Sequence, residues 1–144
     1  MSVLPSFYNQ VVTDWEALTP PTDVTITYHQ VADRTSALGE SGHRSFRFGL
    51  PTRGLNVNMS DTTETVQWFC TATLFLSDSG LSIDALADMV ANEVQLLLGT
   101  VNTRTSWPAG IIEVFVDETD DPDELESGDI EITMNLRVTA GESK

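Results

Sequence analysis

The sequence predicts a single α+β domain spanning residues 1–144, in which a mostly antiparallel sheet of about four to six strands is packed by an N-terminal helix and one long central helix. Two segments carry most of this prediction. Residues 65–76 alternate as a strand does, and residues 83–98 carry one apolar stripe as an amphipathic helix does. An exposed hairpin or loop region is expected in the first half. The chain is long enough to bury one core, and no linker or internal repeat indicates a second domain.

The first expected elements are an N-terminal helix and a strand. Apolar side chains in residues 3–18 fall at helical spacing, and Pro20-Pro21 ends this pattern. Valine, isoleucine and tyrosine alternate with threonine in residues 24–28, which predicts a half-buried strand. Residues 32–45 are polar and contain two glycines, so we expect an exposed loop or hairpin tip there.

Three strands are expected before the central helix. Two short ones, at residues 46–50 and 55–59, are joined by a turn around Pro51 and Gly54. The third, at residues 65–76, is the longest and carries aromatic side chains on both faces, which is typical of a strand in the middle of a sheet.

The central helix has a start signal and a stop signal. A polar turn at residues 77–80 precedes Ser82, which we expect to cap the helix, and Asp84 complements the helix dipole in the first turn. The apolar stripe occupies residues 83–98, and Gly99 is expected to end the helix in the left-handed conformation.

The end of the chain is predicted to form two strands, at residues 111–116 and 130–138, after a turn at residues 107–110. Acidic side chains dominate residues 117–128 between these strands. That segment is therefore predicted to be a solvated loop.

The charge balance excludes several classes of partner. The chain has 22 acidic and seven basic side chains, a net charge of −15, and its basic residues are six arginines and the single Lys144. Such a chain repels phosphates, so we expect neither sequence-specific nucleic acid binding nor a membrane partner. Carboxylates with almost no lysine are typical of proteins kept soluble in concentrated salt. A halophilic host is one hypothesis, and an ordinary acidic protein is the alternative.

No catalytic or metal-binding pattern is present, so the sequence does not favour an enzyme, and we expect neither a cofactor nor a metal site. The two histidines lack partners at metal-ligand spacing, and the lone Cys70 falls within a predicted strand, where a buried thiol is expected. A calcium loop starting at Asp117 would need glycine where Pro122 stands and glutamate where Gly128 stands.

Charged residues are segregated along the chain. Four of the seven basic residues lie in residues 34–53, which contain one acid, whereas residues 113–131 contain ten acids and no base. Segments of opposite charge allow copies of one chain to bind head to tail, and such contacts close into a ring when the rotation per subunit allows. The alternative is that both segments are ordinary exposed loops. The candidate contact residues are Arg44, Arg47, Arg53, Asp117, Glu118, Asp120, Asp121, Asp123 and Glu124.

The order of these elements resembles that of a known family. An amphipathic helix and a strand are followed by a partly basic hairpin region, a long strand entered through Trp68, the turn at residues 77–80 and the helix at residues 83–98. A closing hairpin ends in a strand at residues 129–138. In order and length this resembles the tail terminator proteins of long-tailed phages and archaeal tailed viruses, and the related tail-completion and neck proteins. The resemblance covers nearly the whole chain and rests on element order; the acidic insertion between the last two strands departs from it.

The resemblance implies a structural virion protein at the head–tail junction. It implies a homo-hexameric ring that caps the tail tube, ends its polymerisation and docks to the head-side connector, with the tail tube protein and the connector as partners. Genome DNA would pass through the lumen without specific binding, because carboxylates repel phosphate. Assembly in the host cytoplasm and a final location in the tail or neck of the virion follow from the same resemblance.

Two other hypotheses stay open at the level of sequence. One is another neck or tail-completion protein, or the tail tube protein itself. The other is a small acidic enzyme or binding module with a site that the sequence does not reveal. Oligomeric state separates a ring from such a module, and self-limiting rings differ from polymerising tubes.

Overall fold

The computed structural model describes residues 3–31, 43–59, 63–77, 80–125 and 129–143. Within them the chain forms two helices and a mixed, mostly antiparallel sheet of seven strands, which confirms the predicted α+β class. Two of the strands, β1 and β6, contain only two residues each, and they raise the number of strands above the expected one. The elements are α1 (Leu4–Glu16), β1 (His29–Gln30), β2 (Arg44–Phe48), β3 (Thr52–Met59), β4 (Thr63–Ser77), α2 (Ile83–Thr103), β5 (Ile111–Val116), β6 (Asp123–Glu124) and β7 (Asp129–Ser143).

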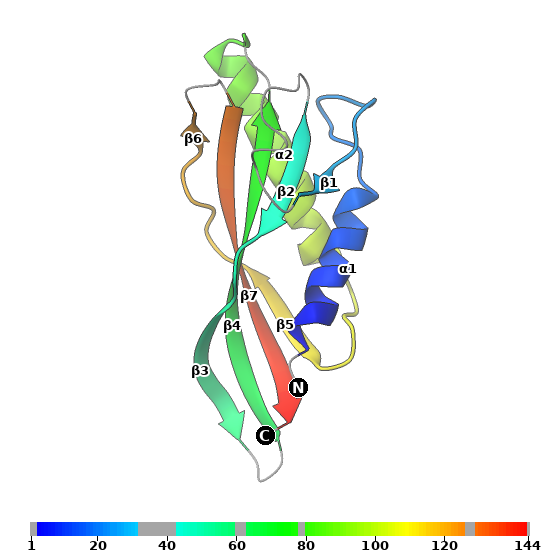
Figure 1. Cartoon of the computed structure of the whole chain (residues 1–144), viewed down its shortest axis with the longest axis vertical. Helices are drawn as coiled ribbons and strands as arrows, with labels where there is room; N and C mark the ends of the chain where they lie inside the picture. Colours follow the sequence, from blue (N-terminus) through cyan, green and yellow to red (C-terminus); the bar gives the residue numbers. More distant parts are fainter. Residues whose placement is uncertain (1–2, 32–42, 60–62, 78–79, 126–128, 144) are drawn as a thin grey trace.

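Two long antiparallel strands, β4 and β7, form the centre of the sheet. They pair over all 15 residues of each strand, from Thr63 opposite Ser143 to Ser77 opposite Asp129. β2 and then β3 pair with the outer side of β4, whereas β5 and β6 pair with the outer side of β7. Figure 1 shows the two long strands side by side over the length of the molecule, with a strong twist where β2 leads into β3. β1 pairs in parallel with β2 on the side away from β4, which makes the sheet mixed. The sheet therefore has two edges, a β4 edge formed by β1, β2 and β3 and a β7 edge formed by β5 and β6.

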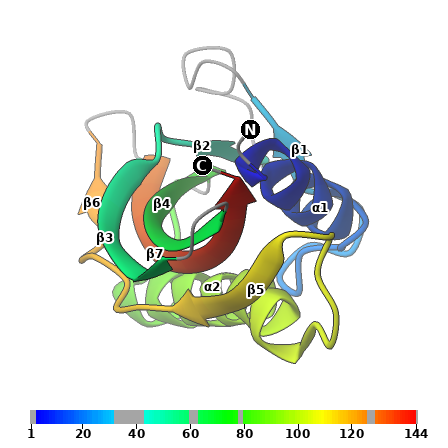
Figure 2. The same cartoon turned by 90° about the horizontal axis from the view of Figure 1, so that it is seen from below.

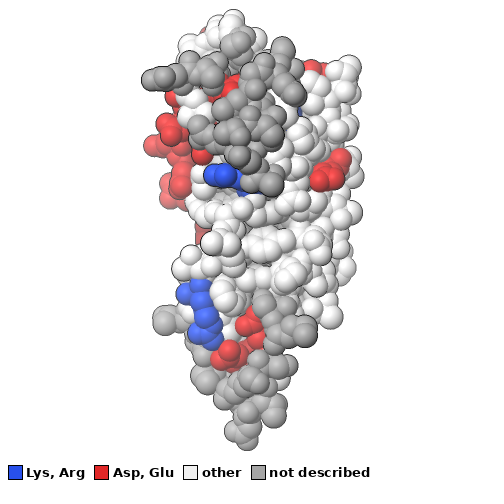
Figure 3. All heavy atoms as spheres, viewed as in Figure 1, with Lys and Arg blue, Asp and Glu red and all other residues white. Residues whose placement is uncertain are grey.

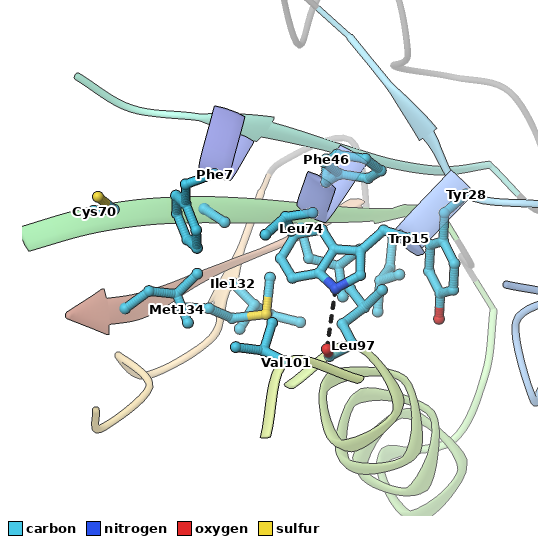
Figure 4. Packing of buried hydrophobic residues seen from close by; sticks show 14 of the residues in the cluster. Phe7, Trp15, Tyr28, Phe46, Cys70, Leu74, Leu97, Val101, Ile132 and Met134 are labelled. Atoms are coloured by element: carbon cyan, nitrogen blue, oxygen red, sulfur yellow. Dashed lines mark hydrogen bonds between the residues drawn. The ribbon is translucent and has the colours of Figure 1, made fainter. Parts of the chain in front are cut away.

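The alternation of side chains along β4 and β7 decides which face of the sheet is buried. One set is fully buried and includes Leu74 and Leu76 on β4 and Ile132 and Met134 on β7. Figure 4 shows Leu74, Ile132 and Met134 within this core. Both helices pack against the curved strands (Figure 2), and their apolar side chains complete this core. The opposite face of the two strands, which we call the polar face, carries mostly threonine and other polar or charged side chains. It also carries Phe69, which is exposed, and Phe75, which is buried, so both faces of β4 carry aromatic side chains as predicted. No helix of the described residues covers this face.

One tryptophan holds the two helices and the sheet together. The indole Nε1–H of Trp15 donates a hydrogen bond to the Leu97 carbonyl oxygen at 3.0 Å, and both side chains are fully buried (Figure 4). The same indole lies edge-on to the ring of Phe46, with the ring centroids 5.0 Å apart. Trp15 thus joins α1, α2 and β2.

The helix α2 begins as predicted and ends later. The Ser82 hydroxyl oxygen accepts a hydrogen bond from the Ala85 N–H at 3.3 Å, which confirms the expected cap. The predicted stop at Gly99 is wrong, because the helix continues to Thr103. Gly99 does not have a positive φ, and Val101 beyond it is buried, so the apolar stripe extends by another turn and packing continues the helix.

The strand predicted at residues 24–28 is also wrong. These residues form turn and irregular structure, and β1 begins only at His29. The Asp23 carboxylate accepts hydrogen bonds from the N–H and the hydroxyl of Thr25, at 3.0 and 2.7 Å. This local turn competes with strand pairing, and it leaves Val24 80% exposed.

The exposed loop predicted at residues 32–45 lies partly outside the described residues, since residues 32–42 are not described. Contrary to the prediction, His43 just before β2 is buried, and so are Arg44 and Ser45, the first two residues of β2. Leu50, expected within a strand, lies instead in the bend between β2 and β3.

The predicted strands near the end of the chain are confirmed. β5 coincides with the predicted segment, and β7 extends beyond its predicted segment at both ends. Parts of the turn predicted at residues 77–80 and of the acidic loop predicted at residues 117–128 lie outside the described residues. Neither α1 nor α2, the helices of the described residues, has the length and apolar character needed to cross a membrane.

Candidate assembly interface

Arg44, predicted as an exposed contact residue, is buried in the core. Its side chain is 1% exposed and forms an ion pair with Glu93 of α2, whose side chain is 0% exposed. The guanidinium also donates to the His43 carbonyl oxygen and to the Thr22 hydroxyl oxygen, both at 3.1 Å. Arg44 is therefore satisfied inside its own chain, and its buried side chain is not available for a contact with another copy.

Glu93 is the acceptor at the centre of this buried cluster. Its carboxylate accepts hydrogen bonds from the hydroxyl groups of Thr22 at 2.7 Å and Tyr28 at 3.3 Å, besides that from Arg44. Burial of this kind, followed by the nearby Glu93 charge, raises the pKa of the Tyr28 hydroxyl. The burial of Glu93 could have been predicted from the sequence. Glu93 stands four residues after Met89, on the side of the helix that carries the apolar stripe of α2.

Arg47 and Arg53 remain partly exposed, and both lie on the β4 edge. The Arg47 guanidinium lies over the ring of Phe75, 5.7 Å from the ring centroid. The Arg53 side chain is 45% exposed and pairs with Glu64 at 3.1 Å. An exposed pair of this kind contributes little to stability, so Arg53 exchanges partners at low cost.

The described part of the acidic segment after β5 is largely an exposed loop, as predicted, but its backbone is held along β7 and includes the two-residue strand β6, which was not predicted. The N–H groups of Asp117 and Asp120 donate to the carbonyl oxygens of Asn135 and Thr133, at 2.9 and 3.0 Å. The Asn135 amide donates to the Glu118 carbonyl oxygen at 2.7 Å. β6 then pairs with β7, so the backbone of this segment follows the β7 edge.

The carboxylates of this segment still face solvent. Asp117 pairs with Arg137 at 3.3 Å, whereas the other predicted acidic contact residues are exposed: Glu118, Asp120, Asp121, Asp123 and Glu124. Figure 3 shows acidic side chains gathered on the upper left, over β6 and the segment before it. The acidic residues and the two exposed arginines thus lie on opposite edges of the sheet, and one copy of the chain does not bring them together.

Two adjoining hollows lie between α2 and the acidic segment, and we call them together the α2 groove. The first, about 410 Å³, is lined mainly by apolar side chains of α2 and by Ile130. The second, about 420 Å³, continues along α2 and shares Val90, Ala91 and Pro122 with the first. Three carboxylate residues also line the groove: Asp120, Asp121 and Glu124.

A further hollow of about 610 Å³ opens on the polar face, beside Phe69 and Asn135, with residues 117–121 along its side. Among the residues that the structure describes, none of those lining this hollow is a histidine, lysine or arginine. Cys70 contributes to the lining, but burial raises the pKa of its thiol, and a protonated thiol is a poor nucleophile. In the described part of the chain, no three metal-ligating side chains are grouped to hold an ion.

Several large apolar side chains are exposed, which the sequence did not indicate. Leu50 is 92% exposed at the bend between β2 and β3, and Ile83 is 77% exposed at the start of α2, beside the α2 groove. Ile112 and Phe115 are also exposed on β5. Leu50 continues the alternation of Phe46 and Phe48, so the pattern alone places it within the strand. The one sequence feature that indicates the end of the strand before Leu50 is the following Pro51, because proline has no N–H to donate to a neighbouring strand.

No family model matches the chain, and no curated protein matches it in sequence.

Proposed function

We propose that the chain is a ring-forming structural subunit at the head–tail junction of a tailed virus. In this role, copies of the chain cap the tail tube, end its polymerisation and dock to the head-side connector. The link to viral tails is the resemblance in element order.

One observation carries the mode of assembly: the sheet has two unlike edges. The β4 edge presents Arg47, Arg53 and the exposed Leu50. The β7 edge presents the exposed carboxylates and the α2 groove. Unlike edges favour head-to-tail contacts, which give closed rings when the rotation per subunit allows. Contacts between two like edges would set like charges against each other.

The order of the elements supports the same role. The long β4 leads through residues 77–80 into the capped α2, and β5 and β7 close the chain, which is the arrangement on which the resemblance rests. The helices cover one face of the β4–β7 pair and leave the polar face as the surface suited to a lumen. Because the chain has a net charge of −15, DNA would pass such a lumen without adhering.

The mass of the purified chain in solution tests this proposal. We expect closed rings of about six copies by light scattering and negative-stain imaging, at about 0.1 M or about 3 M KCl. Filaments that lengthen without limit would favour a tail tube protein instead. A monomer at every salt and protein concentration would contradict self-assembly through unlike edges.

A further inference from the structure

We propose that Leu50 of one copy inserts into the α2 groove of the next copy, and that this contact joins neighbouring subunits. The inference rests on the proposed function and adds the surfaces through which the copies meet. Its partner is a second copy of this chain.

Leu50 lies in the short segment at residues 49–51 that joins β2 to β3 along β4, and we call this segment the corner. The N–H of the preceding Gly49 donates to the Thr71 carbonyl oxygen at 2.9 Å, and a Cβ at Gly49 would collide with the Thr71 hydroxyl, so the backbone lies tightly against β4. The following Pro51 has a fixed φ. The corner presents a leucine that is 92% exposed. A group held in this way loses little conformational freedom on binding, which favours association.

The α2 groove has the shape and polarity to receive an aliphatic side chain. Small side chains on α2, Ala87 and Ala91, leave room beside Val90, and Pro122 and Ile130 form apolar wall on the side of the sheet. Each of the two hollows is larger than a single leucine side chain. Water in such a groove has few hydrogen-bonding partners, so replacing it with an aliphatic group is favourable.

The charges around the two surfaces are complementary. Arg47 and Arg53 each stand three residues from Leu50, on either side of the corner. The lining of the groove includes the carboxylate residues Asp120, Asp121 and Glu124. When the leucine enters the groove, the two guanidiniums approach these carboxylates, and arginine forms directional pairs with carboxylates.

The topology of the sheet makes this contact intermolecular. The corner belongs to the β4 edge, and the groove lies at the β7 edge, so the two surfaces occupy opposite edges of one chain. Each copy therefore offers one corner and one groove. In an open row of copies, one corner and one groove at the two ends stay unoccupied. Every corner and every groove is occupied only when the row closes into a ring.

Disulfide trapping tests the contact directly. In a Cys70→Ala background, Leu50→Cys combined with Ala91→Cys gives each copy one cysteine at the corner and one in the groove. Under mild oxidation we expect a ladder of linked oligomers that stops at the size of the ring. The matched control combines Ala91→Cys with Val24→Cys, because Val24 is also strongly exposed, at 80%, but lies outside the corner. A ladder no stronger than that of the control overturns the contact.

A substitution without cysteines gives an independent measurement. Leu50→Asp should raise the protein concentration needed for half-assembly by at least about tenfold, because it places a carboxylate in an apolar, acidic groove. Val24→Asp, the matched control, should leave that concentration unchanged. Circular dichroism checks that both variants keep the fold.

The outcomes separate this contact from the proposed function. Wild-type rings without the 50–91 ladder, and with assembly unaffected by Leu50→Asp, overturn the contact and leave the ring standing. A 50–91 ladder of open chains without closed rings supports the contact and overturns the proposed ring. The absence of both rings and ladder overturns both.

Discussion

Arg44 and Glu93 neutralise each other inside the core, so removal of one charge leaves the other buried without a partner. We expect Glu93→Ala to lower the free energy of unfolding by about 3–5 kcal/mol, because the guanidinium loses its carboxylate in a site where both side chains are at most 1% exposed. The hydroxyl groups of Thr22 and Tyr28 lose their acceptor in the same change. Urea denaturation with linear extrapolation measures the difference.

A double variant distinguishes the buried charge from a general packing defect. Arg44→Met together with Glu93→Met removes both charges and keeps apolar volume, so we expect it to cost less stability than Glu93→Ala alone. If the double variant is the less stable of the two, the charge imbalance is not the cause. Cluster residues such as Arg44 are unsuitable for testing assembly, since their loss would weaken the fold itself.

The ion pair between Asp14 and Arg104 predicts a pH dependence. Hydrogen bonds from Arg104 hold the pKa of the Asp14 carboxyl below its ordinary value of 3.8. The pair therefore stabilises the fold fully above that ordinary value, and this contribution is lost as the pH falls through the lower, folded value. We expect Asp14→Asn to cost about 1 kcal/mol at pH 7 and almost nothing at a pH below the folded value. Unfolding curves at several pH values measure this; an equal cost at every pH would exclude the ion pair as its source.

At the level of elements, the extension of α2 past Gly99 predicts a stabilising substitution. Gly99 lies inside the helix, and a Cβ there would meet nothing within 4 Å. Gly99→Ala should therefore raise the free energy of unfolding by about 1 kcal/mol, because alanine loses less backbone entropy in a helix. Gly110→Ala is the matched opposite case, since Gly110 has φ of +92° and a Cβ there would collide with Val3. Thermal melts should show a higher Tm for the first variant and a lower Tm for the second.

The spacing of apolar residues correctly predicted the strand and the helix that each bury one apolar face in the core. The same spacing gave a wrong prediction where a single polar contact determines the local structure. The alternation at residues 65–76 and the stripe at residues 83–98 both place one apolar face on a common core, so β4 and the start of α2 were predicted correctly. Apolar and polar side chains alternate equally well in the segment after Asp23. The Asp23 carboxylate, however, accepts hydrogen bonds from Thr25, and the segment forms a turn. Local pattern cannot show such competition.

The candidate interface was predictable only in part, for a related reason. The sequence located the acidic segment and the arginines, but burial of Arg44 depends on Glu93, 49 residues away, and no spacing rule connects them. The α2 groove needs two elements, α2 and the segment before β6, to lie side by side. Exposure of Leu50 depends on where β2 ends, and strand ends are poorly specified by alternation.

For the molecule as a whole, the net charge of −15 predicts a steep dependence on salt. Repulsion among the carboxylates is screened over about 10 Å at 0.1 M salt and about 3 Å at 1 M salt, so we expect the Tm to rise strongly from low to molar KCl. A variant with Asp121→Asn and Asp123→Asn, at two exposed positions, should show a smaller rise. Calorimetry in a KCl series measures both profiles, and a flat wild-type profile would refute adaptation to salt.

The unlike edges of the sheet predict the effect of exchanging their charges. Arg47→Glu with Arg53→Glu should dissociate the proposed ring while circular dichroism stays unchanged, because in the proposed contact acidic side chains would then face the α2 groove, which is lined in part by carboxylates. Adding Asp121→Arg and Glu124→Arg should restore the ring, since the two edges are complementary again with reversed signs.

The net charge of these variants needs a control. Each reversal changes the net charge by two, so the double variant has a net charge of −19 and the quadruple variant returns to the wild-type value of −15. Recovery by the quadruple variant alone does not decide the matter. A second variant with the same net charge but with Glu16→Arg and Glu113→Arg, at two exposed positions outside the α2 groove, must fail to recover the ring. If both quadruple variants assemble, net charge governs assembly and the edges do not pair as proposed.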